Sequence, residues 1–273
     1  MTRTLTWPSD ASPPTRRTAG DWVRFALRGI GQTMITLGLV VLLFVVYELW
    51  VSNYFTERAN HALTHKLETQ WARGDNPLLP LPGRHVPTIA LGTAIANLYI
   101  PRFGPDYHWS ILQGTSQAVL ADGPGHYVGT ALPGQVGNFA VAGHRVGKGE
   151  PFLNLDRLRA GDALITETKP YWFVYRVKGL DHGLTIPDRD GVAGREVVAP
   201  GDGAVLAPYP DHPGRRPVER LMTMTTCTPK FTATQRLIIH AKLAEKVPVL
   251  THKGHRAERM PSGIRRLYTE VHS

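Results

Sequence analysis

The chain of 273 residues contains a single cysteine, Cys227, so its fold cannot depend on a disulfide within the chain. A lone thiol is an inert side chain, half of an intermolecular disulfide or a nucleophile. The sequence also lacks an internal repeat and a basic face with a readout motif, and much of its net charge of +9 lies at the two ends. Nucleic-acid binding is therefore not expected.

One long apolar run lies near the N-terminus. Residues 29–47 carry no charge, and with Leu49, Trp50 and Val51 the run reaches the roughly 20 residues that a helix needs to cross a bilayer. Five arginines precede it, and the positive-inside bias places that end in the cytoplasm and the later residues outside. A cleaved signal peptide is the alternative, but the run is long and residues 51–55 offer no small-residue cleavage site. We predict a cytoplasmic tail at 1–28 and a transmembrane signal anchor at 29–51.

Residues 52–88 are expected to form a stalk and linker, because 53–73 have weak helical periodicity and 74–84 are rich in glycine and proline. His61 and His65 are spaced as zinc ligands on a helix can be, but no third ligand stands nearby, so no metal or cofactor is expected.

From residue 86 onward short apolar runs alternate with glycine, proline and aspartate, which predicts an all-β sandwich or barrel. One or two helical turns are expected at 152–158. One folded domain is predicted at 89–244, followed by a basic, disordered C-terminal tail at 245–273. Contact of that tail with an anionic wall or membrane is the alternative. The predicted strands are 94–100, 109–112, 138–142, 163–168, 172–177, 205–207, 220–227 and 236–243.

Cys227 ends a predicted strand that is free of glycine and proline, and Arg236 begins the next. A hairpin brings the end of one strand beside the start of the other. A cation near a thiol favours the reactive thiolate. An arginine can also donate hydrogen bonds to the oxyanion of acyl transfer, for which one donor is worth about 2.7–4 kcal/mol of barrier. The spacing alone leaves open that Arg236 is solvated or paired with an acid.

A thiol nucleophile also needs a group that moves protons, most often a histidine. His144 is the best candidate, because it follows the predicted strand 138–142 after Gly143 and would lie at a barrel rim. His126, in a loop rich in glycine and proline, is the rival. His240 lies in mid-strand and is interpreted as an outward-facing or core residue. No aspartate or asparagine that would orient His144 is evident.

The segment Thr-Met-Thr-Thr-Cys at 223–227, followed by Arg236, resembles the T-L-x-T-C…R signature of the sortases, the membrane-anchored cysteine transpeptidases of Gram-positive bacteria. Gly-His-Arg at 143–145 matches their histidine motif, and the similarity runs through most of 89–244. Met224 stands where the signature has leucine, a near-isosteric swap. Segments 100–104, 123–127, 129–134 and 161–162 are most similar to class E sortases of high-GC actinobacteria; classes D and F share much of this pattern.

The resemblance implies a sortase-like, eight-stranded antiparallel β-barrel with short helices and a cleft at His144, Cys227 and Arg236. It implies that the Cys227 thiolate attacks the Thr–Gly bond of an LAXTG/LPXTG-type C-terminal sorting signal on a secreted protein. His144 would protonate the leaving amine, and Arg236 would hold the substrate and the oxyanion. An amine of a peptidoglycan precursor would then resolve the thioester. The residues expected to bind substrate are Thr226, His126 and Tyr127.

The expected location is the cell membrane, with one span, the N-terminus in the cytoplasm and the catalytic domain outside. The expected partners are secreted proteins with a sorting signal, the peptidoglycan amine and the membrane itself. Three alternatives stay open at this point: a pilus-type sortase that uses a protein lysine as nucleophile, a plain cysteine protease, and an inactive membrane-anchored barrel that only binds peptide or wall polymer.

Overall fold

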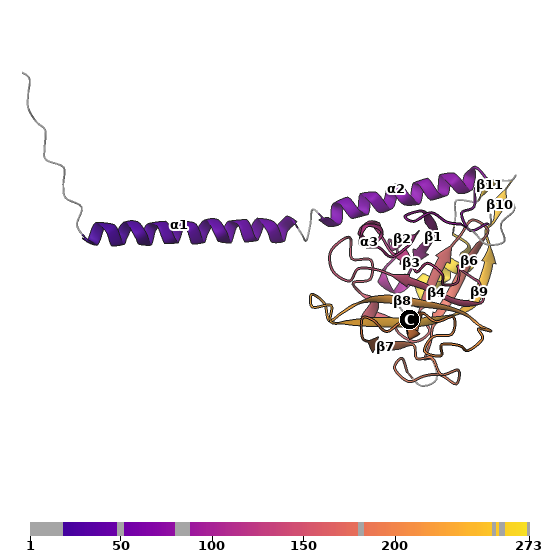
Figure 1. The fold of residues 1–273 in the computed structure, drawn as a ribbon. Coiled ribbons are helices and arrows are strands. Elements are labelled where there is room, and N and C mark those ends of the chain that lie inside the picture. The colour runs from indigo at the N-terminus through magenta and orange to yellow at the C-terminus, as the bar shows by residue number, and fades with distance from the viewer. Residues whose placement is uncertain are drawn as a thin grey trace, which may run out of the picture. The chain divides into compact units, whose positions relative to one another are not determined.

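The computed structural model describes residues 19–47, 52–79, 88–179, 183–252, 255–256 and 260–271. The chain divides into two units, Met1–Tyr47 and Glu48–Ser273. The described part of the first unit is one helix, α1 (Ala19–Val46) (Figure 1).

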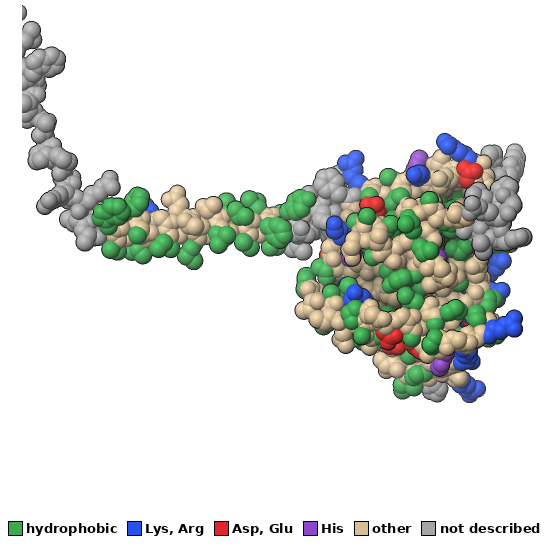
Figure 2. All heavy atoms as spheres, viewed as in Figure 1, with side chains coloured by type: hydrophobic (Ala, Val, Ile, Leu, Met, Phe, Trp, Pro, Cys, Tyr) green, Lys and Arg blue, Asp and Glu red, His purple; other side chains and the backbone are tan. Residues whose placement is uncertain are grey.

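Helix α1 is long and apolar enough to cross a membrane over Trp22–Val46, which has a mean hydropathy of 2.2. Its surface is mostly hydrophobic side chains (Figure 2). The apolar helix begins before the predicted boundary at residue 29, because Trp22, Val23 and Phe25 extend the apolar surface around Arg24 and Arg28. Residues 48–51 of the predicted anchor lie outside the described residues.

Within the described part of the second unit, nine strands form one sheet, of which eight close into a barrel (Figure 1). The order is β6-β5-β1-β2-β3-β4-β8-β9-β7, and a further pairing of β6 with β9 closes the ring. β7 pairs with residues 236–239 of β9, the part of that strand that β6 does not reach. The predicted eight-stranded barrel with short helices is thereby confirmed. Its strands are β1 (Ala94–Tyr99), β2 (His108–Gln113), β3 (Gly125–His126), β4 (Gly137–Ala142), β5 (Ala163–Glu167), β6 (Tyr171–Val177), β8 (Arg220–Thr228) and β9 (Gln235–Pro248), with β7 at Arg195–Val198.

The sequence resemblance implied an antiparallel barrel, but two of the strand pairs are parallel. β2 pairs with β3, and β4 with β8, in parallel. Parallel neighbours need a crossover between them. The short helix α3 (Gln117–Asp122) lies in the β2–β3 connection, and strands β5 to β7 lie in the connection from β4 to β8. No periodicity in the strands themselves shows which distant partner each one takes.

Seven of the eight predicted strands coincide with barrel strands to within a few residues at one end or the other, and β9 runs farthest beyond its prediction. The eighth, at 205–207, is wrong: the chain forms a 3₁₀ turn, η4 (Ala204–Leu206), between Gly203 and Pro208. The expected turn at 152–158 is η3 (Leu155–Arg157). The sequence pattern indicates neither β3, which has two residues, nor β7, which begins with Arg195 and Glu196 and is extended through its pairing with β9.

Alternation along β8 separates the barrel core from its outer surface. Met222 and Met224 belong to the main buried cluster inside the barrel. Successive side chains of a strand point to opposite faces, so Thr223, Thr225 and Cys227 lie on the outer face. β4 follows the same rule, with Phe139 and Val141 in the core.

Helix α2 (Ser52–Ala72) lies in the segment predicted as stalk and linker, and it packs on the barrel (Figure 1). Leu67 and Trp71 are 0% and 3% exposed and pack against Leu112 and Val119. With Leu63 they recur every four residues, which gives the helix one apolar stripe.

The C-terminal region also differs from the expected disordered tail beyond residue 244. β9 continues to Pro248, a two-stranded hairpin follows (β10, Thr251–His252; β11, His255–Arg256), and α4 (Ser262–Glu270) packs on the barrel. Ile264 and Leu267 are buried against Ile165 and Trp172. Their spacing of three residues places both on one helix face.

If α4 is part of the folded domain, Ile264→Ala or Leu267→Ala should lower the free energy of unfolding by about 2–5 kcal/mol, the usual cost of truncating a buried aliphatic side chain. Urea unfolding followed by tryptophan fluorescence measures this. Arg266→Ala, on the exposed face of the same helix, is the control and should leave the midpoint nearly unchanged. Equal midpoints for all three variants would restore the disordered-tail interpretation.

Candidate active site

Three of the predicted site residues come together at neighbouring strand ends. Cys227 on β8 is the register partner of Arg236 on β9. On the other side, β4 runs parallel to β8 with Ala142 opposite Thr225, so two residues farther on His144 stands level with Cys227. The amide of Gly143 donates to the carbonyl of Thr225 at 3.1 Å, which continues this register past the end of β4.

Directly opposed residues on paired strands project from the same face of a sheet. His144, Cys227 and Arg236 thus share the outer face of the barrel, with Cys227 in the middle. Neighbouring strands lie about 4.8 Å apart, so His144 and Arg236 belong to the two segments that flank Cys227. Gly143 is needed just before His144, because a Cβ there would lie 2.5 Å from the ring of Phe152.

The His144 imidazole is half-buried, and no described residue forms a hydrogen bond with its buried Nε2 atom. Burial lowers the pKa of His144 below its ordinary value, and the cationic Lys148 lowers it further. A buried ring nitrogen without a partner costs free energy. This nitrogen thus keeps a hydrogen-bonding capacity that no described residue uses.

Arg145, the neighbour of His144, contacts the end of β8 beside Cys227. The sequence alone did not predict this contact. Its side chain is buried, and Nη1 donates to Thr228 Oγ1 at 2.7 Å and to the carbonyl of Cys227 at 3.4 Å. Nη2 pairs with Asp156 Oδ1 at 3.1 Å. Arg145 thus ties the backbone of the nucleophile strand to the segment that carries His144. The signal for it was its place in the Gly-His-Arg motif, beside the histidine.

Arg236 lines a small cavity of about 190 Å³ on the outer face of the sheet. Its Nη1 donates to the carbonyls of Ala233 and Gln235, both at 3.1 Å, which holds the guanidinium at the start of β9. Tyr127 lines the same cavity, and its hydroxyl lies 2.9 Å from Thr225 Oγ1. The other walls come mainly from β7 and the loop after it: Val198, Pro200, Gly201, Asp202, Gly203, Val205, Leu206 and Ile238.

Two residues expected to bind substrate are placed elsewhere. Thr226 is 2% exposed, and its Oγ1 donates to the carbonyl of Gly143 at 2.8 Å. This bond links β8 to the residue before His144. His126 is also 2% exposed, with Nδ1 2.8 Å from Gln113 Oε1 and Nε2 3.0 Å from the carbonyl of Ala131. Both ring nitrogens are used inside the protein, which corrects the expectation that His126 contacts substrate or rivals His144.

Among the described residues, one group could hold a metal ion, since ligand atoms of Glu196, Asp211 and His240 lie within 4.8 Å of one another. His240 is fully buried, with Nδ1 2.8 Å from Thr223 Oγ1 and Nε2 2.7 Å from Glu196 Oε1. Although burial opposes it, the hydrogen bond from His240 lowers the pKa of Glu196. These bonds account for His240 as a buried structural residue on the outer face of the sheet, where it joins β7, β8 and β9.

The strand register thus places a thiol between an imidazole and a guanidinium. The comparisons with known proteins identify the family of the chain. The model of the sortase domain family matches residues 98–244. The chain therefore belongs to the sortase family, whose members are cysteine transpeptidases.

The relatives include two class E sortases of Streptomyces coelicolor. Sortase SrtE1 is 35% identical over 230 residues, covering 82% of this chain and 58% of that protein, so the chain spans less than two thirds of its length. Sortase SrtE2 is 32% identical over 242 residues, covering 85% of this chain and 88% of that protein. Among solved structures, the SrtF sortase from Corynebacterium diphtheriae is 37% identical, with a TM-score of 0.55 over 68% of this chain and 98% of that one.

Arg145→Met should lower the free energy of unfolding by about 1–3 kcal/mol. The reason is that two acceptors on β8, the Cys227 carbonyl and Thr228 Oγ1, lose a charged donor. Because Cys227 then loses an anchor, cleavage of a donor peptide should fall on the order of tenfold to a hundredfold. Chemical unfolding and steady-state kinetics measure the two effects. The control is Arg157→Met, which removes an exposed cation from η3. Unchanged kinetics in Arg145→Met would show that the contact is only structural.

Lys148→Met should raise the pKa of His144, because the imidazolium would no longer face a like charge. The fall in imidazolium with rising pH would then occur at a higher pH than in the parent protein. The NMR titration of the His144 ring proton measures it. Lys148→Arg keeps the cation and should leave the titration in place. If both variants titrate alike, the charge of Lys148 is not a cause of the shift.

Proposed function

We propose that this protein is a membrane-anchored transpeptidase that cleaves the Thr–Gly bond of an LAXTG/LPXTG-type sorting signal and transfers the protein to an amine of a peptidoglycan precursor. The observation that carries the proposal is the placement of His144, Cys227 and Arg236 on three adjoining strand ends, with the buried Nε2 of His144 lacking a partner. Membership of the sortase family supports the reaction class.

In the first half-reaction the Cys227 thiolate attacks the threonine carbonyl carbon, and the carbonyl electrons move to oxygen. Arg236, on the strand opposite Cys227, donates hydrogen bonds to that oxyanion and to the substrate backbone. When the tetrahedral intermediate collapses, the C–N bond breaks and His144, as imidazolium, gives its proton to the leaving glycine amine. The product is a thioester between threonine and Cys227.

In the second half-reaction an amine attacks the thioester carbonyl. His144, now neutral, takes a proton from the attacking nitrogen, and the Cys227 thiolate leaves. The lowered pKa of His144 suits the role of proton acceptor, because the neutral ring dominates near neutral pH. The first step instead draws on the small imidazolium fraction.

The cavity beside Arg236 supports recognition of an apolar residue of the signal. Val198, Val205, Leu206 and Ile238 give it aliphatic walls, and its volume of about 190 Å³ admits one aliphatic side chain. The Tyr127 hydroxyl, bonded to Thr225, lies at its edge beside the nucleophile strand.

Helix α1 supports a site of action at the membrane. It has the length and hydropathy of a single span. The arginines on its N-terminal side favour a cytoplasmic N-terminus. The barrel would then face outward, where secreted proteins emerge and peptidoglycan precursors are used.

Cys227→Ala should abolish both cleavage of a fluorogenic Leu-Ala-x-Thr-Gly peptide and thioester capture, because no other group can form the acyl intermediate. His144→Ala should lower cleavage by about 10²–10⁴-fold, and Arg236→Met by about 10²–10³-fold. Fluorescence and intact-protein mass spectrometry read the two steps. Full cleavage by the Cys227→Ala variant would contradict the proposal.

The control is Asp122→Asn, an exposed change on α3, which should behave like the parent protein. Mass spectrometry of the joined product then identifies the amine. A peptidoglycan-type amine agrees with the proposal, a protein lysine indicates a pilus-type enzyme, and hydrolysis alone, even with added amine, indicates a protease.

A further inference from the structure

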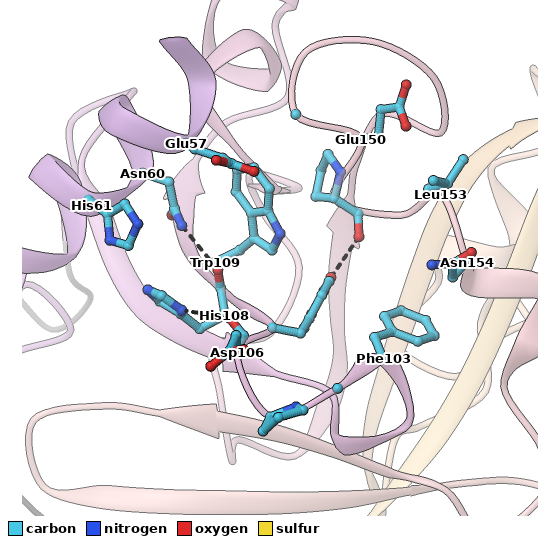
Figure 3. Close-up of a pocket in the computed structure, with 15 residues that line it drawn as sticks. Glu57, Asn60, His61, Phe103, Asp106, His108, Trp109, Glu150, Leu153 and Asn154 are labelled. Atoms are coloured by element: carbon cyan, nitrogen blue, oxygen red, sulfur yellow. Dashed lines mark hydrogen bonds between the residues drawn. The ribbon is translucent and has the colours of Figure 1, made fainter. Parts of the chain in front are cut away.

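A second and larger cavity, of about 780 Å³, lies between α2, the start of β2 and the segment that follows His144 (Figure 3). Its volume falls within the usual range of ligand sites. From α2 come Glu57, Asn60 and His61, which face Asp106, His108 and Trp109, while Glu150, Leu153 and Asn154 stand on the opposite wall (Figure 3). The steps assigned above to Cys227, His144 and Arg236 use none of these residues.

Strand register places this cavity at the same end of the barrel as the thiol. β3 runs antiparallel to β4, with Gly125 opposite Ala142 at the end of β4. β2 runs parallel to β3, with Leu112 opposite Gly125, so His108 at the start of β2 lies beyond the end of β4. His144 leaves the barrel at that same end. The 149–154 wall is a continuation of the His144 segment, and the amide of Phe152 donates to the carbonyl of His144 at 3.0 Å.

The walls are held together by hydrogen bonds, so the cavity exists before a ligand arrives. Asn60 is 4% exposed; its Nδ2 donates to the carbonyl of His108 at 3.0 Å, and its Oδ1 accepts from the amide of Ser110 at 2.9 Å. The Tyr107 hydroxyl donates to the carbonyl of Pro151 at 2.7 Å. Burial raises the pKa of Tyr107, which keeps this hydroxyl protonated.

The charge of the cavity selects its ligand. Three carboxylates line it, Glu57, Asp106 and Glu150, and none of the fifteen lining residues is lysine or arginine. The cations adjacent in sequence to lining residues, Arg58, Arg102 and Lys148, are not part of the lining, and Arg102 pairs with Asp162. This acidic cavity stands in a chain of net charge +9. It disfavours phosphates and carboxylates and favours an ammonium group.

We propose that this cavity is the acceptor subsite: it binds a cationic side group of the amine-bearing peptide while a different amine of that peptide attacks the thioester. This rests on the proposed function. The geometry fits because the leaving amine and the attacking amine both exchange protons with His144, whose own segment forms a wall of the cavity. The attacking amine must be neutral, so the ammonium in the cavity is a separate group.

The test uses two acceptor peptides, both amidated at the C-terminus: Gly-Gly-Gly-Lys and Gly-Gly-Gly-norleucine. They share the attacking glycine amine and differ in one ammonium group. In the full-length protein in detergent, KM for the lysine peptide should be roughly 1.5-fold to fivefold lower at equal kcat, as expected of partly exposed charge pairs. The difference should shrink in 0.5 M NaCl, where the screening length falls to about 4 Å.

Glu57→Gln combined with Asp106→Asn should bring the two KM values together, while Glu68→Gln on the exposed side of α2 and Asp122→Asn on α3 should preserve the difference. Donor hydrolysis without amine should stay within about twofold of the parent in every variant, which shows that the fold and the first half-reaction are intact. Equal KM values in the parent protein, or a difference that survives the double change, would overturn the subsite.

A second measurement separates this inference from the proposed reaction. Binding of both peptides to the Cys227→Ala protein, followed by calorimetry, needs no chemistry. Tighter binding of the lysine peptide that is lost in the Glu57→Gln/Asp106→Asn background supports the subsite even if donor cleavage fails. Equal binding of both peptides rejects it even if cleavage succeeds.

Discussion

The parallel register of β4 with β8 is the constraint on which the site depends. It sets Ala142 opposite Thr225 and thereby brings His144 level with Cys227. The β8–β9 hairpin supplies Arg236 from the other side. A slip of one residue would turn Cys227 toward the barrel core and separate it from both partners, because side chains alternate between the faces of a strand. Burial of Met222 and Met224 inside the barrel holds that register in place.

The site lies on the outer face of the barrel and is only partly open to water. β7 and the loop after it cover the sheet beside Arg236, and Phe152 packs against Gly143 beneath the His144 segment. The His144 ring itself is half-buried, and among the described residues its Nε2 has no hydrogen-bond partner. Burial and the nearby Lys148 cation lower the pKa of His144, which favours the neutral ring near neutral pH.

The segment after β4 connects three parts of the molecule. It carries His144, anchors the Cys227 strand through Arg145, and forms one wall of the acidic cavity against α2. The packing of α2 on the barrel is thus relevant to function, because without Asn60 and Glu57 the cavity would lack one side. In the proposed reaction, this one segment would contact both the strand that carries the thiol and the cavity that binds the acceptor peptide.

Sequence alone determined what depends on short separations and on residue type. Cys227 and Arg236 are joined by a hairpin, the apolar run of α1 is continuous, and seven strands show in the local pattern, so each was predictable. Tertiary structure decided what depends on distant partners: the β4–β8 pairing, the burial of His126, the packing of α2 and α4, and the role of Arg145. These features depend on contacts between segments far apart in the chain. Closure of the barrel determines which distant segments become neighbours, and local sequence patterns do not contain that information.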